Sequence, residues 1–527
     1  MKKIIGIGRF VFLWTLFGSV CGMSQEACPF GVSMHLDGGE EYSHMPENFR
    51  MLREAGIRWV RTDFSWSGME GPQGKWHFDF LDRVVEEAEK QGLQILAPLL
   101  YNVPWANPAY AHPDAWLKYV EKAVTRYKDR VKHWEIWNEP NLYPRFWDRR
   151  EDAANYALLL EATAKKIREI DPDAVIVHAG LAGIPTAYIE KSFAAGSGRS
   201  FDKFAVHPYR APMDTWEATD RFCEDIRELR ALMAKYGIEQ KGIWFTEMGL
   251  TTMTGVTVRD RDAFHEDGKE TGRDWRVAVV CDEDFPVDAS ISAQTLREFF
   301  PAGFRLDSIG IAGVRQIQRE KYDAVFFPPA DNFPLHISRM IDPYLTRYLR
   351  EGGKIYCYTK TGSMYYYGDA REKETAQAVF IAQTLLLSLR FGIERYFWYE
   401  MESPEENIFD REDNFGLTHR GLGPKPAYFA YATAGRLFPE GSAIDSSVEW
   451  KQKDCCVVNW RRPDGTRVWA VWSPEGVRQV NVKIGRGLQQ AFHCLGTPLP
   501  AVTEAARSLE VGPEVIYLAG PESLDIQ

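Results

Sequence analysis

The sequence HWEIWNEPN, at residues 133–141, decides the fold, and IWFTEMG at residues 243–249 is its counterpart. Each stretch is a short apolar run that ends in a glutamate, Glu139 in the first and Glu247 in the second. Short apolar runs of this kind are typical of strands buried in a parallel sheet. In a β/α barrel, the side chains at the carboxyl ends of the strands point into one mouth. We therefore expect the two carboxyl groups to face each other across such a mouth.

The chain on both sides of these stretches has the pattern of repeated β/α units. From residue 29 onward, short apolar runs alternate with amphipathic segments, and helical spacing of apolar residues is clear at 79–91 and 152–170. Eight strands, each followed by a helix, predict a closed (β/α)8 TIM barrel. The predicted strands begin near Gly31, Ile57, Leu93, Lys132, Ala174, Phe204, Gly242 and Ile393.

The connection between the seventh and eighth predicted strands is much longer than the others. It covers 151 residues, whereas the earlier strand starts are 26 to 42 residues apart. We interpret residues 254–367 as a flavodoxin-like α/β domain inserted into the barrel, with a charged, glycine-containing linker at 254–273. The predicted strands of this domain are 275–280, 322–327 and 354–359, and its predicted helices are 290–300 and 337–350.

The inserted segment has no recognisable nucleotide motif. Its first strand is followed by CDED at 281–284, without the G-x-G-x-x-G loop that cradles a dinucleotide, and no nucleophile elbow surrounds Cys281. A nucleotide site and an amidase activity are therefore not expected. Because the segment leaves the barrel beyond Glu247, we expect it to lean over the mouth or to project from its rim. In the second case it would offer an interface for a homo-oligomer.

The end of the chain predicts a different architecture. Residues 421–438 are typical of the helix that closes the barrel, so we assign 25–253 and 368–438 to the barrel. Residues 439–527 alternate between apolar and polar side chains and predict a small β-sandwich, in which Cys455 and Cys456 occupy opposite faces of one strand. The predicted strands of the sandwich are 454–460, 467–472 and 479–484.

The first 24 residues predict an export signal. A basic start precedes an apolar run at 10–20, and small residues at 22–24 suit cleavage. The run is too short to span a bilayer and no later segment is long enough, so we expect no membrane span. Cys21 raises the alternative of a lipid anchor, but 18–20 is a poor lipobox. We therefore expect simple cleavage and a periplasmic or secreted protein.

Composition excludes some partners and leaves others open. A net charge of −11 argues against nucleic acid or an anionic membrane as a partner. The 17 Trp, 23 Tyr and 30 Phe suit stacking against sugar rings, although a large core would also account for them. Apart from Cys21, seven cysteines remain, an odd number without metal-like spacing. We predict no metal site, no cofactor and no essential disulfide.

The motif NEP at 138–140, together with TE at 246–247, resembles the catalytic motifs of glycoside hydrolase clan A. These are retaining (β/α)8 enzymes with glutamates on strands four and seven. The resemblance covers residues 29–250 and 370–435 and is closest to family 39, which holds β-xylosidases and α-iduronidases, to judge by WNEPN at 137–141. It implies a carbohydrate substrate.

The resemblance also assigns roles to individual residues. It implies that Glu139 is the acid/base, that Glu247 is the nucleophile and that Asn138 hydrogen-bonds the sugar's 2-hydroxyl. Glycoside cleavage needs one carboxyl group to protonate the leaving oxygen and another to attack the anomeric carbon. An isolated glutamate is most often a solvated surface residue, but two at matched strand ends favour function. Glu135, by contrast, is expected deeper in the barrel.

Three further residues have roles that the resemblance suggests. Arg61 matches the clan's arginine, whose charge would keep the nucleophile ionised, although a buried ion pair is the alternative. His207 and Tyr209 lie in HPY, which resembles the clan's H-x-Y, where the tyrosine can hydrogen-bond the nucleophile. The alternative for Tyr209 is a core aromatic with a satisfied hydroxyl.

Three aromatic side chains are weaker candidates for the pocket. Trp398, at the end of the eighth strand, fits a stacking platform under the reacting sugar, with a core aromatic as the alternative. His35 on strand one and Tyr101 on strand three line the pocket or pack within the barrel.

The sequence thus predicts an exported, retaining glycosidase that removes terminal sugars. A retaining enzyme holds its two carboxyl groups about 5–5.5 Å apart, against roughly 6.5–9.5 Å for an inverting one. One alternative is a catalytically silent glycan-binding protein on the same scaffold. Another is a transglycosylase, which would use the same residues but exclude water.

Overall fold

A computed structural model describes residues 28–36, 38–252, 256–258, 274–280, 304–327, 335–358, 364–368, 370–404 and 410–527. The predicted export signal, Cys21, the CDED stretch and the predicted helix at 290–300 lie outside these residues. Within them, no helix has the length and apolar character needed to cross a membrane.

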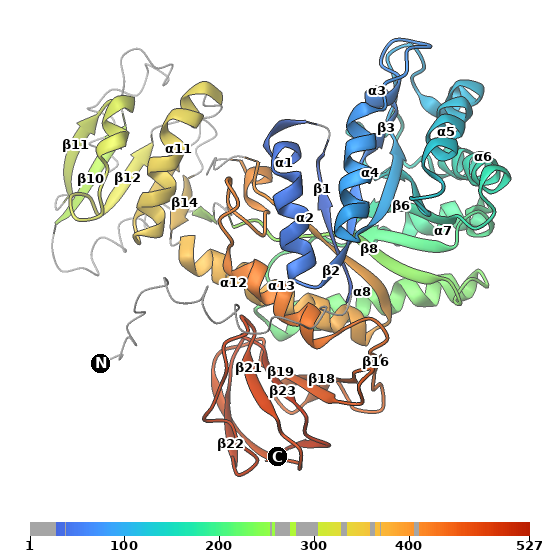
Figure 1. The fold of residues 1–527 in the computed structure, drawn as a ribbon. Helices are drawn as coiled ribbons and strands as arrows, with labels where there is room; N and C mark the ends of the chain where they lie inside the picture. Colours follow the sequence, from blue (N-terminus) through green and yellow to red (C-terminus); the bar gives the residue numbers. More distant parts are fainter. Residues whose placement is uncertain are drawn as a thin grey trace.

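Eight parallel strands form a closed barrel, which confirms the predicted fold (Figure 1). Closure is complete because the last strand pairs with both the seventh and the first. Each observed strand begins within three residues of its predicted start. The barrel strands are β1 (Cys28–Met34), β2 (Ile57–Thr62), β4 (Gln94–Leu100), β5 (His133–Asn138), β6 (Val175–Ala182), β7 (Lys203–His207), β8 (Gly242–Met248) and β15 (Ile393–Tyr399), and the short β3 (Phe64–Ser65) pairs with β4.

Most of the helices that surround the barrel are amphipathic and bury one face against the strands. In α4, for example, Leu81, Val84, Val85 and Ala88 are buried, and the left-handed Gly92 ends the helix. The helices of this layer are α1 (Gly39–Ser43), α2 (Met45–Glu54), α3 (Trp66–Met69), α4 (Asp79–Gln91), α5 (Pro113–Tyr127), α6 (Ala153–Ile170), α7 (Thr186–Ala194), α8 (Trp216–Lys235), α12 (Ala370–Arg390) and α13 (Pro426–Leu437).

The amino-terminal half of the barrel interior is a tightly packed plug. Trp59, Trp244 and Phe397 form its centre, and all three are almost completely buried. Gly31 on β1 lies against this plug, where an added Cβ would fall 2.4 Å from the Phe397 ring and 2.8 Å from Trp59. Close packing therefore requires glycine at this position. The plug fills the floor of the barrel, and the polar residues lie above it.

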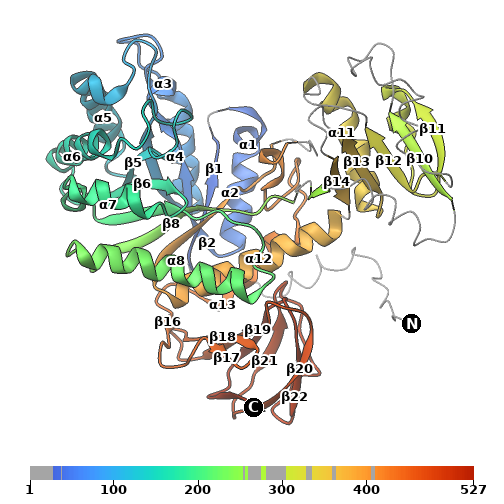
Figure 2. The ribbon, with the colours of Figure 1, turned by 180° about the vertical axis from the view of Figure 1, so that it is seen from behind.

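The inserted α/β domain has one sheet, in the order β11-β10-β12-β13-β14-β9. The first four strands are parallel in flavodoxin-like order, and the last two are antiparallel. The linker prediction for 254–273 needs correction, because β9 is an edge strand of this sheet. The domain lies beside the barrel (Figures 1 and 2). Its elements are β9 (Val256–Val258), β10 (Trp275–Val280), β11 (Phe304–Ile309), β12 (Ala324–Phe327), α11 (Leu335–Arg350), β13 (Lys354–Tyr358) and β14 (Met364–Gly368).

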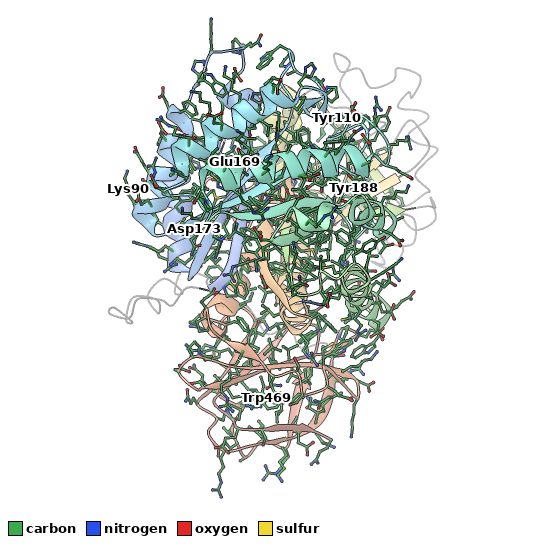
Figure 3. All side chains as sticks on the ribbon, turned by 90° about the vertical axis from the view of Figure 1, so that its right-hand side faces the viewer. Lys90, Tyr110, Glu169, Asp173, Tyr188 and Trp469 are labelled. Atoms are coloured by element: carbon green, nitrogen blue, oxygen red, sulfur yellow. The ribbon has the colours of Figure 1, made fainter. Side chains whose placement is uncertain are left out.

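The C-terminal part of the chain consists of antiparallel sheets that pack against α12 and α13 (Figure 2). As predicted, Cys455 and Cys456 point to opposite faces of one strand, since they belong to different hydrophobic clusters. Trp469 lies in this domain, away from the barrel helices that carry Glu169 and Tyr188 (Figure 3). The strands are β16 (Ala443–Ile444), β17 (Lys451–Gln452), β18 (Cys455–Arg461), β19 (Arg467–Trp472), β20 (Arg478–Ile484), β21 (Gln490–His493), β22 (Ser508–Val511), β23 (Ile516–Ala519) and β24 (Leu524–Ile526).

Candidate active site

A cavity of about 360 Å³ opens at the carboxyl ends of the barrel strands. Its lining comes from several strands and from the loops that follow them, which is where barrel enzymes build their sites. Eight of the nine predicted site residues line it. They are His35, Arg61, Tyr101, Asn138, Glu139, His207, Tyr209 and Glu247.

The two predicted catalytic glutamates come together in this cavity. Glu139 directly follows β5, Glu247 lies near the end of β8, and the side chains of both are mostly buried. One carboxyl oxygen of each glutamate and one nitrogen of His207 all lie within 4.8 Å of one another. The strands of the barrel therefore present both carboxyl groups to a single reacting bond.

The backbone around Glu139 is strained. Tyr101, Trp137 and Glu139 have φ angles of 69°, 78° and 45°, in the left-handed region that non-glycine residues rarely adopt. Each such residue costs on the order of 1–3 kcal/mol, and such residues cluster at functional sites. The Glu139 amide donates to the Gly180 carbonyl at 2.9 Å. This bond anchors the strained turn to β6.

Arg61 connects three of the polar groups. It is 2% exposed, and its Nη1 donates to Glu247 Oε1 at 2.7 Å. Its Nε donates to Glu135 Oε2 at 2.6 Å, and its Nη2 donates to Asn138 Oδ1 at 2.9 Å. Arg61 therefore has both of the expected roles, because it pairs with the candidate nucleophile and also forms a buried ion pair with Glu135. Glu135 is fully buried below the cavity, as predicted.

The surroundings of Glu247 favour its ionised form. Burial alone would raise the pKa of Glu247, but the charges of His207 and Arg61 outweigh burial and hold the pKa below its ordinary value. The Tyr209 hydroxyl strengthens this effect by donating to Glu247 Oε2 at 2.9 Å. Burial and the nearby Glu247 charge raise the pKa of Tyr209, so this hydroxyl keeps its proton.

His207 lies between the two glutamates. Its Nδ1 is 2.9 Å from Glu139 Oε1 and 3.6 Å from Glu247 Oε2, and its Nε2 is 3.0 Å from Thr246 Oγ1. Burial would lower the pKa of His207, but the charges of Glu247 and Glu139 outweigh burial and raise it. The imidazole thus responds to the charge of both carboxyl groups.

The prediction for Trp398 was wrong. Its side chain is completely buried, packs against Phe380 of α12 and donates from Nε1 to the Phe415 carbonyl. Successive side chains of a strand point to opposite faces, so Trp398 faces the helices and Tyr399 faces the cavity. The Tyr399 hydroxyl is 3.0 Å from His35 Nε2.

Several lining residues escaped the sequence analysis. Phe146, in the loop after β5, stacks on Tyr101 with ring centroids 5.9 Å apart. Its place just beyond a strand end could have revealed it. Arg411 and Glu412 also line the cavity, but they lie more than ten residues beyond β15, too far for their position to be inferred from a strand end. None of the described residues of the inserted domain lines the cavity.

Glu139, His207 and Glu247 have the spacing of a possible cation site. The Arg61 guanidinium already places a positive charge 2.7 Å from Glu247, which opposes a second cation there. His207 Nδ1 and Glu139 Oε1 are at hydrogen-bonding distance from each other. The arrangement suits proton transfer better than metal ligation.

Comparisons with known proteins find glycoside hydrolases. Residues 23–276 match the family model "Cellulase (glycosyl hydrolase family 5)". A 6-phospho-beta-glucosidase from Clostridium longisporum is 29% identical in an alignment of 173 positions that covers 27% of this chain and 36% of that protein. The chain therefore spans about a third of the length of this curated relative.

Many solved structures share the fold, among them two family 39 enzymes. A family 39 glycoside hydrolase from Bacteroides cellulosilyticus WH2 is 17% identical with a TM-score of 0.61, over 94% of this chain and 81% of that chain. A GH39 enzyme from Xanthomonas axonopodis pv. citri is 13% identical with a TM-score of 0.51, over 95% and 96%. The resemblance to clan A glycoside hydrolases is confirmed, in sequence by the family 5 model and, for family 39, in the fold.

Proposed function

We propose that this protein is a retaining glycosidase in which Glu139 is the acid/base and Glu247 is the nucleophile. The observation that carries the proposal is the pairing of two carboxyl groups in unlike surroundings. One oxygen of each group lies within 4.8 Å of the other, and this close approach favours the spacing of about 5–5.5 Å in retaining enzymes over roughly 6.5–9.5 Å in inverting ones. Arg61 and Tyr209 hold Glu247 as a carboxylate, ready to attack.

The proposed reaction has two displacements at the anomeric carbon. In the first, a Glu247 oxygen bonds to that carbon, the bond to the leaving oxygen breaks, and Glu139 gives its proton to that oxygen. In the second, the oxygen of a water molecule bonds to the carbon, the bond to Glu247 breaks, and Glu139 accepts a proton from the water. Each displacement inverts the carbon, so the product keeps the configuration of the substrate.

We further propose that the substrate is a terminal sugar residue of an oligosaccharide or small glycoside. A volume of about 360 Å³ is at the small end of the range for ligand pockets, roughly 300–1,000 Å³. The stacked Tyr101 and Phe146 offer a flat apolar wall for a sugar ring or an aglycone. The predicted export signal supports action outside the cytoplasm on such glycosides. A catalytically silent glycan-binding protein would not need the buried charge network around Glu247.

An aryl-glycoside panel tests the proposal. β-Glucosides belong in it because a relative is named a 6-phospho-beta-glucosidase, together with xylosides, galactosides and uronides. We expect turnover of at least one member, with retained configuration by NMR of the first product. Inverted product would contradict the mechanism, and no turnover of any member would favour the binding protein. Mid-chain products from a linear oligosaccharide would contradict the preference for terminal sugars.

Variants of the two glutamates test the assignment of roles. Glu247→Ala should abolish turnover, and azide should restore it while giving a glycosyl azide of inverted configuration. Glu139→Ala should lose activity mainly on substrates with poor leaving groups, and azide should give the retained glycosyl azide. Glu169→Ala is a matched control, because Glu169 is exposed on α6 (Figure 3). Full activity of Glu139→Ala on poor leaving groups would contradict the assignment.

A further inference from the structure

A line of hydrogen bonds runs from the buried Glu135 to the candidate acid/base. Thr246 Oγ1 is 3.1 Å from Glu135 Oε1 and 3.0 Å from His207 Nε2, and His207 Nδ1 is 2.9 Å from Glu139 Oε1. All of these side chains are buried. Glu135, at the buried end of this line, determines where the protons along it lie.

Glu135 can only accept hydrogen bonds. Arg61 Nε donates to its Oε2 at 2.6 Å and the Gly180 amide donates to its Oε1 at 2.7 Å, so both oxygens face positive or N–H groups and the side chain is a carboxylate. The single hydroxyl proton of Thr246 is therefore directed to Glu135 Oε1. Thr246 Oγ1 then has only lone pairs left for His207. It follows that His207 Nε2 carries a hydrogen and donates it to Thr246.

With Nε2 protonated, one proton remains for the contact between His207 Nδ1 and Glu139 Oε1. It lies either on Nδ1, beside an ionised Glu139, or on Glu139, beside a neutral imidazole. We propose that His207 and Glu139 form one acid/base unit that shares this proton, with Thr246 and Glu135 as positioning residues that fix the tautomer. The inference rests on the proposed glycosidase function. It adds His207 to Glu139 as a second group that can hold the proton of the acid/base.

The imidazole has room beside Thr246 only because residue 180 is a glycine. A Cβ added at Gly180 of β6 would fall 1.9 Å from His207 Nε2 and 2.6 Å from Thr246 Oγ1, so the bare glycine is what admits the pair. The charged and titratable groups that face His207 are Glu247, Glu139 and Arg61, with Tyr209 and Glu135 linked to them. The two carboxylates raise the pKa of His207, which agrees with a proton held at this unit.

The fixed tautomer has a consequence for the reaction. Once Glu139 has given the shared proton to the leaving oxygen, a lone pair of His207 Nδ1 faces the new carboxylate. That contact is repulsive, so the unit regains a proton readily, and the proton comes from the attacking water of the second displacement. Were the proton on Nδ1 instead, the imidazole would stabilise the carboxylate and make Glu139 a weaker base. Thr246 therefore sets the pH range in which the acid is available.

Thr246→Val tests the proposal, because valine keeps the shape of threonine but removes the acceptor for Nε2–H. In this variant the imidazole proton should move to Nδ1. The basic limb of the pH profile of kcat/KM should then shift to lower pH by about one unit on a glycoside with a poor leaving group. On a dinitrophenyl glycoside, which needs no acid, Thr246→Val should leave the pH profile of kcat/KM unchanged. Thr246→Ser should restore the wild-type limb. An unmoved limb in Thr246→Val would overturn the proposal.

A second measurement is independent of turnover. ¹⁵N NMR of histidine-labelled, substrate-free protein reports which nitrogen of His207 carries hydrogen, with the signal assigned by its loss in His207→Gln. We expect Nε2 to be protonated in the wild type and Nδ1 alone in folded Thr246→Val above the titration of the unit. A wild-type His207 protonated only on Nδ1 would refute the proposal even if Thr246→Val did not fold. Absence of glycosidase activity, in contrast, would refute only the proposed function.

Discussion

At the residue scale, the arrangement depends most on Arg61. One planar guanidinium reaches Glu135, Asn138 and Glu247, and all four side chains are buried. A lysine ammonium is a compact point charge and cannot reproduce this fork of donors. The buried ion pair and the activation of the nucleophile are therefore properties of the same side chain.

Arg61→Lys should lower kcat/KM on the order of 100-fold, as loss of one hydrogen-bond donor to the reacting groups does in other active sites. The sign of the pH effect follows from Glu247, whose pKa Arg61 helps to hold below its ordinary value. With weaker pairing that pKa rises, so the acidic limb of kcat/KM should move to higher pH. The measurement is the full pH profile, with Arg50→Lys on the exposed face of α2 as control. An acidic limb that moved to lower pH would contradict this account.

Tyr209→Phe is a smaller change in the same place. It removes the hydroxyl that donates to Glu247 Oε2 and leaves the ring. We expect about a tenfold loss in kcat/KM, the size of one hydrogen bond to a charged group, and an upward shift of the acidic limb. Steady-state kinetics across pH measures both effects. An unchanged limb would show that the tyrosine only packs.

At the element scale, β15 shows that the face on which a side chain lies decides its role. Trp398 and Tyr399 are neighbours in sequence, yet Trp398 packs on α12 and Tyr399 lines the cavity. Within this single strand, Trp398 therefore contributes to stability and Tyr399 to the site.

Trp398→Ala should lower the free energy of unfolding by about 3–5 kcal/mol, because it removes a completely buried indole. Tyr399→Ala should affect stability less and mainly lower kcat/KM on aryl glycosides, because it removes a wall of the cavity and the partner of His35. Urea unfolding and steady-state kinetics on both variants test the contrast. The reverse ranking in the two assays would show that the assigned orientations are wrong.

The barrel strands and their ends are the parts of the fold and of the site that the sequence could predict. Hydrophobic periodicity locates each barrel strand to within three residues, because those strands are buried on both faces. Strand ends in turn locate Glu139 and Glu247 and most residues beside them. The side-chain alternation of β15 was ambiguous because residues 396–399 are all aromatic. Arg411 and Glu412 enter the site through tertiary folding of a long loop, which leaves no periodic signal.

At the scale of the whole molecule, the C-terminal sheets are continuous with the barrel's core. Cys456, Trp460 and Trp472 belong to the same buried cluster as the barrel helices, and Trp460 Nε1 donates to the Leu437 carbonyl of α13 at 2.7 Å. Trp469 belongs to a separate cluster on the other face of its sheet. The barrel and this domain should therefore unfold together.

Trp460→Ala should lower the thermal midpoint of the whole protein and keep a single transition that coincides with loss of the active site. Trp469→Ala is the matched comparison, because it removes the same side chain from the other cluster, and it should leave more of the barrel's stability intact. Calorimetry run in parallel with activity after heating tests the difference. Two separate transitions in the unmutated protein would contradict a shared core.

The position of the inserted domain also sets the order of biosynthesis. β8 pairs with β15 across the whole insertion, so seven strands and the nucleophile are made well before the strand that closes the barrel. At roughly 5–20 residues per second, about 150 residues take about 8–30 seconds to synthesise. For that time β8 is the open edge of an unfinished sheet, and closing such a distant contact is entropically slow. The nascent chain thus passes through a long-lived incomplete barrel, the stage at which a chaperone would have the most to bind.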